Sequence, residues 1–181
     1  KSYVKFTPFY LSAKKHKIEK PVNNKYANYY NKTIGDEYEK SLDVFYKTNN
    51  FIAVHGGREN AIKILKNLKK FKKYKSERDY PAIGTTMLSA YLKFNVVSVR
   101  EVYYSITKYA GSSELIKQLY WRDFYMIVSY HHPEVFGKNM NGKIINWKND
   151  KKLFDKWKDG KTGIPIIDAA MNQLNNTGYM H

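Results

Sequence analysis

A short string rich in hydroxyl groups, Gly-Thr-Thr-Met-Leu-Ser at residues 84–89, stands where a loop enters a predicted helix. Thr85, Thr86 and Ser89 supply three hydroxyls beside the backbone N–H groups that a first helical turn leaves unpaired. These N–H groups and the helix dipole both favour a negative charge, so such a turn can hold a phosphate. Simple capping of the helix by the same hydroxyls explains the string equally well.

A second string, Trp-Arg-Asp-Phe-Tyr at residues 121–125, combines flat rings with charges. Trp121 and Tyr125 stand four residues apart, which predicts one shared helix face. A flat aromatic beside a cation and a phenol suits a planar ligand or a base flipped out of a duplex. The alternative is a partly buried aromatic helix in which Arg122 is paired with an acid.

Other catalytic patterns are absent from the sequence. It has no Gly-x-Gly-x-x-Gly fingerprint, no Walker loop and no His-Glu-x-x-His motif. Its 5 histidines lack metal-ligand spacing, and the lack of cysteine excludes disulfides, thiolate catalysis and cysteine-ligated metals. We therefore expect no metal site. No apolar run approaches the ~18 residues needed to cross a bilayer.

Helices must position these strings. Apolar residues recur at helical spacing over 61–71 and lysines cover the other faces, which predicts an amphipathic helix. Ser98 and Glu101 have the spacing of a capping box. Residues 111–113, Gly-Ser-Ser, are expected to open a long helix that Pro133 stops.

The residues expected to begin and end two further helices are also typical of a helical chain. Asn149 is expected to cap a short helix that ends at Gly160, and Pro165 to begin another that Gly178 ends. No stretch alternates with period two over a convincing length, so the sequence predicts an all-α fold.

Three further segments are predicted from turn residues and periodicity. Residues 1–25 contain two prolines and a basic stretch and predict an irregular connector, whereas residues 37–46 predict a helix. Residues 74–86 are expected to form a loop.

Charge points to the kind of partner. The 32 Lys and Arg against 16 Asp and Glu give a net charge of +16, which favours a polyanion such as DNA. Arginine is scarce beside lysine, as AT-rich coding would produce, so codon bias is the competing explanation for part of this charge.

Taken together, the strings resemble the photolyase/cryptochrome family, specifically the helical flavin-binding domain of class I DNA photolyases. The most specific segment, Gly-Lys-Thr-Gly-Ile-Pro-Ile-Ile-Asp-Ala-Ala-Met at residues 160–171, resembles a signature of that family. Residues 119–125 resemble a second signature. Residues 85–89 resemble the Thr-Ser-x-Leu-Ser turn of the family, and residues 78–81 resemble the segment before that turn. Residues 4–10 resemble the entry into this domain from an N-terminal antenna domain.

The resemblance implies a fold and a reaction. Members of the family fold as an N-terminal α/β domain followed by an all-α domain that holds FAD in a U shape. Reduced flavin, excited by blue light, donates an electron to a pyrimidine dimer flipped out of DNA. The dimer splits and the electron returns, so FAD and dimer-containing DNA are the expected cofactor and partner.

The resemblance also implies roles for the matched residues. Arg122 is expected near the flavin, and the FAD phosphates and ribityl chain are expected at Tyr74, Thr85, Thr86, Met87, Leu88 and Ser89. The DNA-facing positions are Arg78, which would contact phosphates, together with Trp121 and Tyr125.

Three positions carry the expected chemistry. Trp121 would stack on the flipped dimer, and Trp147 matches the surface end of the tryptophan chain that reduces the flavin. Gln118 stands where cyclobutane-dimer photolyases usually have Glu, while Gln is common there in (6-4) photolyases and animal cryptochromes. Gln can donate a hydrogen bond but cannot supply a proton, which leaves the lesion class open.

The resemblance predicts the domain organisation. Residues 1–25 are expected to be the interdomain connector and residues 26–181 a truncated FAD-binding domain, inactive alone unless a separate polypeptide completes it. The alternatives are a cryptochrome-type photoreceptor and a non-enzymatic remnant of a split photolyase gene. An intracellular location, where DNA is, follows from the expected substrate, and the compartment stays open.

Overall fold

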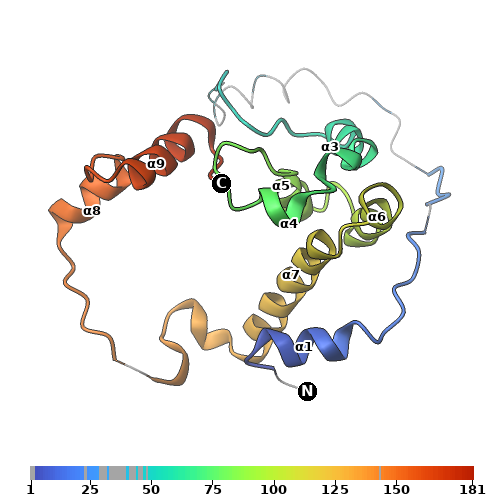
Figure 1. Ribbon diagram of the computed structural model, residues 1–181, viewed down its shortest axis with the longest axis horizontal. Helices are drawn as coiled ribbons and strands as arrows, with labels where there is room; N and C mark the ends of the chain where they lie inside the picture. The colour runs from blue at the N-terminus through green and yellow to red at the C-terminus, as the bar shows by residue number, and fades with distance from the viewer. Residues whose placement is uncertain are drawn as a thin grey trace. The chain divides into compact units, whose positions relative to one another are not determined.

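The computed structural model describes residues 3–22, 24–28, 32, 40, 44, 47, 49–142 and 144–181. Their regular structure is helical throughout, with no strand among them, so the predicted all-α fold is confirmed (Figure 1). The chain divides into two compact units, one of residues 1–21, 56–154 and 181 and the other of residues 22–55 and 155–180. Each unit is described by itself.

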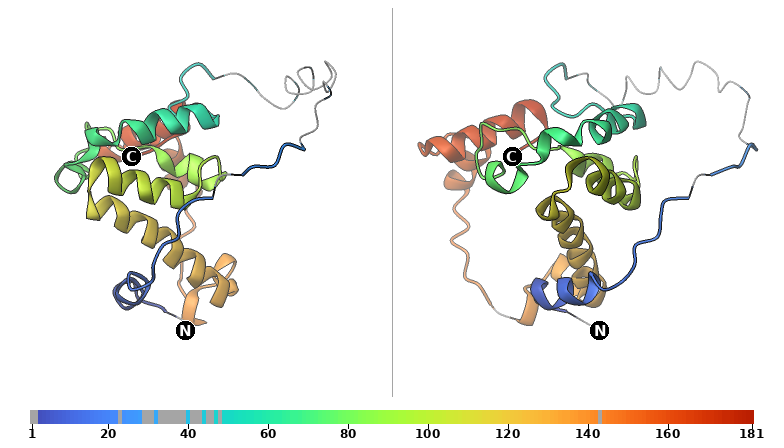
Figure 2. Two further views of the ribbon diagram at one scale, coloured as in Figure 1. Left: turned by 90° about the vertical axis from the view of Figure 1, so that its right-hand side faces the viewer. Right: turned by 45° about the vertical axis from the view of Figure 1, so that its right-hand side comes forward.

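The first unit begins with a short helix where an irregular connector was expected. Helix α1 spans Phe6–Ala13, so the prediction of irregular structure is wrong for these residues. Pro8 is the third residue of the helix, where a backbone N–H has no partner within the helix, and its missing N–H therefore costs nothing. Phe9 is buried, and α1 packs against helix α7 in both views of Figure 2.

The lysine-rich stretch is helical and amphipathic, as predicted, but broken. Helix α3 spans Arg58–Lys66 and a 3₁₀ turn, η1, spans Leu68–Phe71. Between them Asn67 donates a side-chain hydrogen bond to the carbonyl oxygen of Lys63 at 2.8 Å, which ends α3. The buried side of the two elements consists of Ala61, Leu65 and Leu68.

Two short helices follow. Helix α4 spans Tyr74–Glu77, so the loop expected over 74–86 is wrong for its first four residues. Helix α5 spans Leu88–Lys93, directly after the hydroxyl-rich string.

The central helices have the predicted caps. Helix α6 spans Val99–Ser105 and opens with the expected capping box, in which Ser98 Oγ accepts from Glu101 N at 3.1 Å and Glu101 Oε2 accepts from Ser98 N at 2.8 Å. A π-helical turn, η2, spans Ile106–Ala110. Helix α7 spans Ser113–His131 and ends just before Pro133, as predicted.

The C-terminal elements are close to expectation. Two 3₁₀ turns, η3 at Pro133–Phe136 and η4 at Met140–Gly142, precede helix α8, Lys151–Lys158. Its first turn is capped by Asp150, which accepts from Lys152 N and Leu153 N at 2.9 and 3.1 Å, so the assignment of the cap to Asn149 is wrong. An aspartate carboxylate accepts both bonds, whereas Asn149 has a φ of +48° and precedes the cap position.

Helix α9 spans Pro165–Thr177, with Pro165 as its first residue and Gly178 at its end, as predicted. Most of the helix expected over 37–46 lies outside the described residues.

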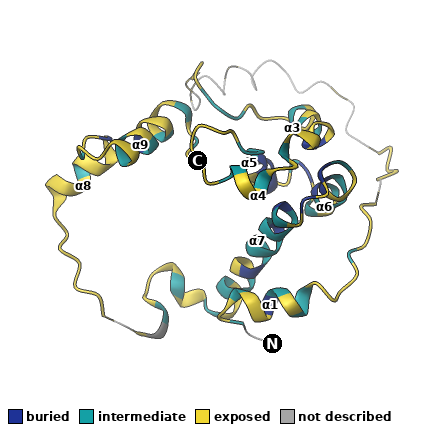
Figure 3. Cartoon of the chain, in the orientation of Figure 1, coloured by how far each residue is buried: buried dark blue, intermediate teal, exposed yellow. Residues whose placement is uncertain are grey.

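Buried residues of the first unit lie mainly on α3, α5, α6 and the adjoining part of α7 (Figure 3). The buried apolar side chains of the first unit are Phe9, Ala61, Leu65, Leu68, Leu88, Tyr91, Leu92, Val97, Val102, Ile106, Ala110, Leu115, Leu119 and Phe124. Among the helices of the described residues, none is long and apolar enough to span a membrane.

Candidate functional site

Helix α7 carries the string Trp-Arg-Asp-Phe-Tyr of residues 121–125, with Trp121 and Tyr125 on one face. The rings of Trp121 and Tyr125 lie 5.7 Å apart at 25°, so the predicted shared face is confirmed. Trp121 is half-buried, while the Tyr125 side chain is 60% exposed. A flat surface therefore extends from the packed middle of α7 toward solvent.

One side of the Trp121 indole is occupied by a residue that the sequence did not single out. The ring of Phe6, from α1, stacks on it with centroids 3.6 Å apart and planes 6° apart. Phe124 meets the indole edge-on at 5.7 Å. Residues 6 and 121 are far apart in the chain, so no local pattern could have linked them.

Arg122 is paired with its neighbour on α7. Its Nη1 donates to Asp123 Oδ1 at 3.0 Å, and the two side chains are 31% and 48% exposed. Burial raises the pKa of the Asp123 carboxyl, and the charge and hydrogen bond of Arg122 offset part of that rise. The pairing of Arg122 with an acid agrees with the alternative stated above, a partly buried aromatic helix.

Gln118 lies one turn before Arg122 on the same helix. Its Nε2 donates a long hydrogen bond of 3.5 Å to the carbonyl oxygen of Glu114, one turn earlier. A weak bond of this length holds the amide loosely. The side chain is half-buried and remains able to donate to another acceptor.

The hydroxyl-rich string forms a strained turn before α5. Met87 has a φ of +52°, a left-handed conformation, and Thr86 Oγ1 accepts from Leu88 N at 3.4 Å. The side chain of Ser89 is exposed, those of Thr85 and Thr86 are half-buried, and that of Leu88 is buried in the core. The N-cap residue of α5 is Met87, which makes no side-chain capping bond, so the expected capping by a hydroxyl of the string is not found at the N-cap.

Helix α4 brings two more predicted residues beside α7 (Figure 1). Tyr74 is its first residue and is half-buried, and Arg78 follows its last. The Nε of Arg78 is buried without a hydrogen-bond partner, with Asp79 Oδ1 as its ion-pair neighbour at 3.6 Å. A buried donor of this kind is a position that a bound acceptor would satisfy.

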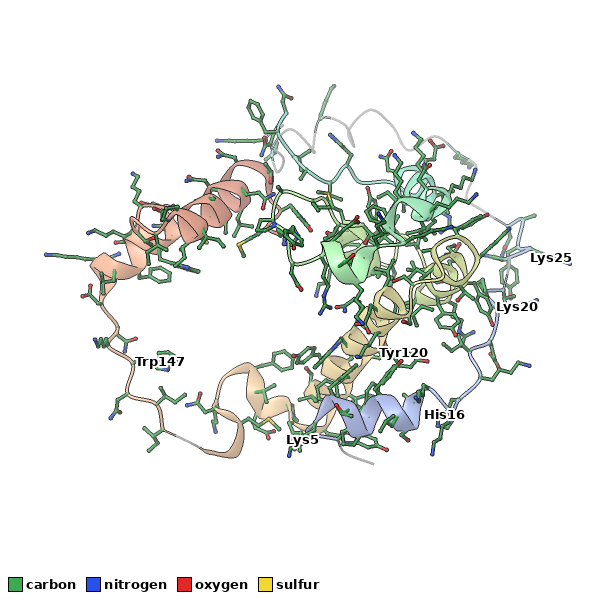
Figure 4. The ribbon with its side chains drawn as sticks, in the orientation of Figure 1. Lys5, His16, Lys20, Lys25, Tyr120 and Trp147 are labelled. Atoms are coloured by element: carbon green, nitrogen blue, oxygen red, sulfur yellow. The ribbon has the colours of Figure 1, made fainter. Side chains whose placement is uncertain are left out.

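Trp147 stands apart from this group. Figure 4 shows it on the extended segment before α8, away from Tyr120 on α7. Its side chain is 68% exposed and lines an open hollow of about 1100 Å³ together with His132, Phe136 and Ile145. The structure therefore gathers the α4 and α7 residues but not Trp147.

A second pocket lies between residues 17–19, α6 and α7. It has a volume of about 460 Å³ and is lined by Lys17, Ile18, Glu19, Val99, Arg100, Tyr103, Leu119, Tyr120 and Asp123. Burial raises the pKa of the Tyr120 hydroxyl at its wall. Across the described ranges, no three histidine, aspartate or glutamate side chains gather in a way that could hold a metal ion.

The signature segment in the second unit is organised by one carboxylate. Asp168 accepts from Thr162 N at 2.8 Å, from Thr162 Oγ1 at 2.6 Å and from Gly163 N at 2.9 Å. The hydroxyl of Thr162 is the largest cause of the lowered pKa of Asp168. Asp168 had no predicted role of its own, although a carboxylate early in a helix is favoured by the helix dipole.

Comparison with known proteins is consistent with this arrangement. Residues 115–181 match the family model described as the FAD binding domain of DNA photolyase. The deoxyribodipyrimidine photo-lyase of Alkalihalophilus pseudofirmus is 42% identical over 134 residues, which are 69% of this chain and 28% of that protein. Cryptochrome DASH of Xenopus laevis is 39% identical over 105 residues, 53% of this chain and 20% of that protein.

The fold has a counterpart among solved structures. The archaeal photolyase of Sulfolobus tokodaii, solved with two FAD molecules, matches with a TM-score of 0.81 and 34% identity. The match covers 97% of this chain and 40% of that chain, so the present chain spans less than half the length of the relatives it matches. In sequence and in fold, the chain belongs to the DNA photolyase/cryptochrome family and corresponds to part of its FAD-binding helical domain.

Proposed function

We propose that the chain is part of a DNA photolyase, a blue-light-driven, FAD-dependent enzyme that splits pyrimidine dimers in DNA. The observation that carries the proposal is the packing of α4 against α7, which brings Tyr74 and Arg78 to the helix that holds Trp121 and Arg122. Two separate motif segments thereby contribute to one neighbourhood.

The residues present fit a flavin nucleotide. Ser89 presents an exposed hydroxyl at the turn before α5, and the half-buried Thr85 and Thr86 precede it in the same turn. Tyr74 and residues 85–89 would hold the phosphates and ribityl chain, with Arg122 near the ring system. Bound and reduced, FAD supplies the light-excited electron that splits the dimer.

The DNA-facing residues have separate tasks in this proposal. Trp121 offers a flat surface on which an extrahelical base stacks, extended by Tyr125. Arg78 and the nearby lysines contact phosphates, which gives an affinity that falls with salt and ignores sequence. Gln118 donates a hydrogen bond to the lesion, and Trp147 forms the surface end of the path that reduces the flavin.

A cryptochrome-type photoreceptor is the second candidate. The 39% identity to Cryptochrome DASH over 105 residues favours it, because such a protein shares the cofactor site of a photolyase. A remnant without catalytic activity is the third.

A chimera separates these candidates. The stretch of this chain that aligns with the Alkalihalophilus pseudofirmus photo-lyase replaces its counterpart in that protein, which supplies the rest of the domain. Flavin absorbance and the loss of dimers in irradiated DNA under blue light are then measured. We expect both, and we expect Trp121→Ala to abolish most repair while flavin absorbance persists.

The other outcomes are informative. Flavin absorbance without loss of dimers would favour the photoreceptor, and absence of flavin from a folded chimera would favour the remnant. A chimera carrying Phe94→Ala, a change at a 77% exposed residue, is the control for nonspecific damage.

A further inference from the structure

Phe6 is held rigidly at the place where it meets Trp121. It stacks on Tyr10 with centroids 5.6 Å apart and planes 13° apart, and its helix is anchored by Phe9, which is only 5% exposed. The ring of Phe9 in turn packs 5.6 Å from Phe124 on α7. The Phe6 ring is therefore fixed by the α1–α7 packing.

Resting on the proposed function, we propose that Phe6 is a positioning residue for base recognition. Phe6 closes one of the two faces of the Trp121 indole, at 3.6 Å and 6°, so that an extrahelical base stacks only on the opposite face. It also stops the indole from rotating about its side-chain bonds. A side chain fixed before binding loses less conformational entropy when the ligand arrives.

The ligand that this arrangement accepts is planar and aromatic. The Tyr125 ring, 5.7 Å from the indole at 25° and 60% exposed, adds a second aromatic ring that solvent can reach on α7. A nucleobase released from its stack gains contact over both rings, whereas the phosphates of an undamaged duplex gain nothing from them. Phe6 therefore affects preference for the lesion and leaves phosphate affinity unchanged.

The first experiment measures the indole directly, without DNA. Trp147 and Trp157 are replaced by Phe in the full chain, so that Trp121 is the one remaining tryptophan, and its fluorescence is quenched with acrylamide. Phe6→Leu should raise the quenching constant about twofold or more, whereas Phe6→Tyr and the matched control Phe94→Leu should leave it unchanged. An unchanged constant in Phe6→Leu would overturn the proposal.

The second experiment measures preference. Affinities of the full chain are compared for a duplex with one thymine dimer and the undamaged duplex of the same sequence. Phe6→Leu should lower the ratio of the two affinities roughly 2- to 10-fold, the range that aromatic pairs are worth, and Phe6→Tyr should restore it. Affinity for the undamaged duplex should not change.

The outcomes distinguish the two proposals. Wild-type preference for the dimer that Phe6→Leu leaves intact overturns the role of Phe6 alone. A wild-type chain without preference for the dimer overturns the positioning role of Phe6, whereas the proposed function is tested separately by flavin absorbance and repair in the chimera. Thermal unfolding of Phe6→Leu and Phe94→Leu identifies any loss that comes from unfolding.

Discussion

Two aspartates, one in each compact unit, have pKa values displaced in opposite directions. Asp123 on α7 is half-buried, and burial raises its pKa despite the neighbouring Arg122. Asp168 on α9 accepts three hydrogen bonds from Thr162 and Gly163, which lower its pKa. The surroundings of Asp123 on α7 therefore depend on packing with elements distant in the chain. The surroundings of Asp168 depend on hydrogen bonds to residues close in the chain.

The two compact units also differ in how many apolar side chains they bury. Buried apolar side chains of the first unit lie on α1, α3, α5, α6, α7 and the turns between them, whereas Met171 is the one buried apolar residue among the described residues of the second unit. Ile164 and Ile166 in the signature segment are 51% and 67% exposed. Glycine is required at position 160 of the signature, where φ is +64° and a Cβ would lie 3.1 Å from the side chain of Asn172.

The largest expected effect comes from emptying the α1–α7 interface. Phe124→Ala removes a ring that is 5% exposed and contacts Phe6, Phe9 and Trp121. We expect a loss of about 3–5 kcal/mol in the free energy of unfolding, measured with urea. Phe94→Ala, at an exposed phenylalanine, should stay within about 0.5 kcal/mol. A loss below about 1 kcal/mol in Phe124→Ala would contradict the central place given to this interface.

A smaller loss in the free energy of unfolding is expected when a local hydrogen bond of the first unit, in the capping box of α6, is removed. Ser98→Ala removes the hydroxyl that accepts from Glu101 N, and it should cost about 1 kcal/mol in the same measurement. Ser113→Ala, at an exposed serine just inside α7, is the matched control and should be nearly neutral. Equal losses in both variants would mean that the capping box does not stabilise α6.

The smallest effect is the opposite pH dependence of the two aspartates. Asp168 has a lowered pKa, so its contribution is complete above the ordinary aspartate pKa of about 3.9 and is lost as pH falls below it. Hydrogen exchange of the Thr162 and Gly163 amides should therefore quicken severalfold toward low pH, beyond its intrinsic pH dependence. Asp168→Asn should show fast exchange already at neutral pH.

Asp123 should behave in the reverse sense. Because its pKa is raised in the folded state, ionisation of Asp123 destabilises the fold. The free energy of unfolding is therefore greatest below the ordinary aspartate pKa and falls as pH rises through the raised pKa. Asp123→Asn should remove this fall, as urea unfolding at a series of pH values would measure. A wild-type curve that rises over this window relative to Asp123→Asn would contradict the role given to burial.

The same division explains what the sequence could and could not predict. Caps and helix ends at Ser98, Pro133, Pro165 and Gly178 were predictable because each depends on residues close in the chain. Helix α1 was missed because Pro8 was taken as an interruption although it stands in the first turn, and because the packing of Phe9 against Phe124 on α7 depends on residues far apart in the chain. The cap of α8 was placed one residue early because Asn149 and Asp150 are both good capping residues.

The candidate site was predictable in part. The spacing of Trp121 and Tyr125 predicted their shared face, since i, i+4 neighbours lie together on any helix. The cover of Phe6 over Trp121 was not predictable, because it depends on tertiary packing. The roles of individual residues toward FAD and DNA came from the resemblance and stay predictions, whereas the expected relation to FAD is supported by the match to the FAD binding domain of DNA photolyase.

The left-handed backbone of Met87 limits how this chain can vary. A residue with a side chain at a φ of +52° is under strain, which glycine lacks and which asparagine or aspartate bears easily. Valine and isoleucine, branched next to the backbone, are the poorest candidates there. Drift at this position should thus run toward small or flexible side chains, and a laboratory library of position 87 should return glycine and asparagine far more often than branched residues.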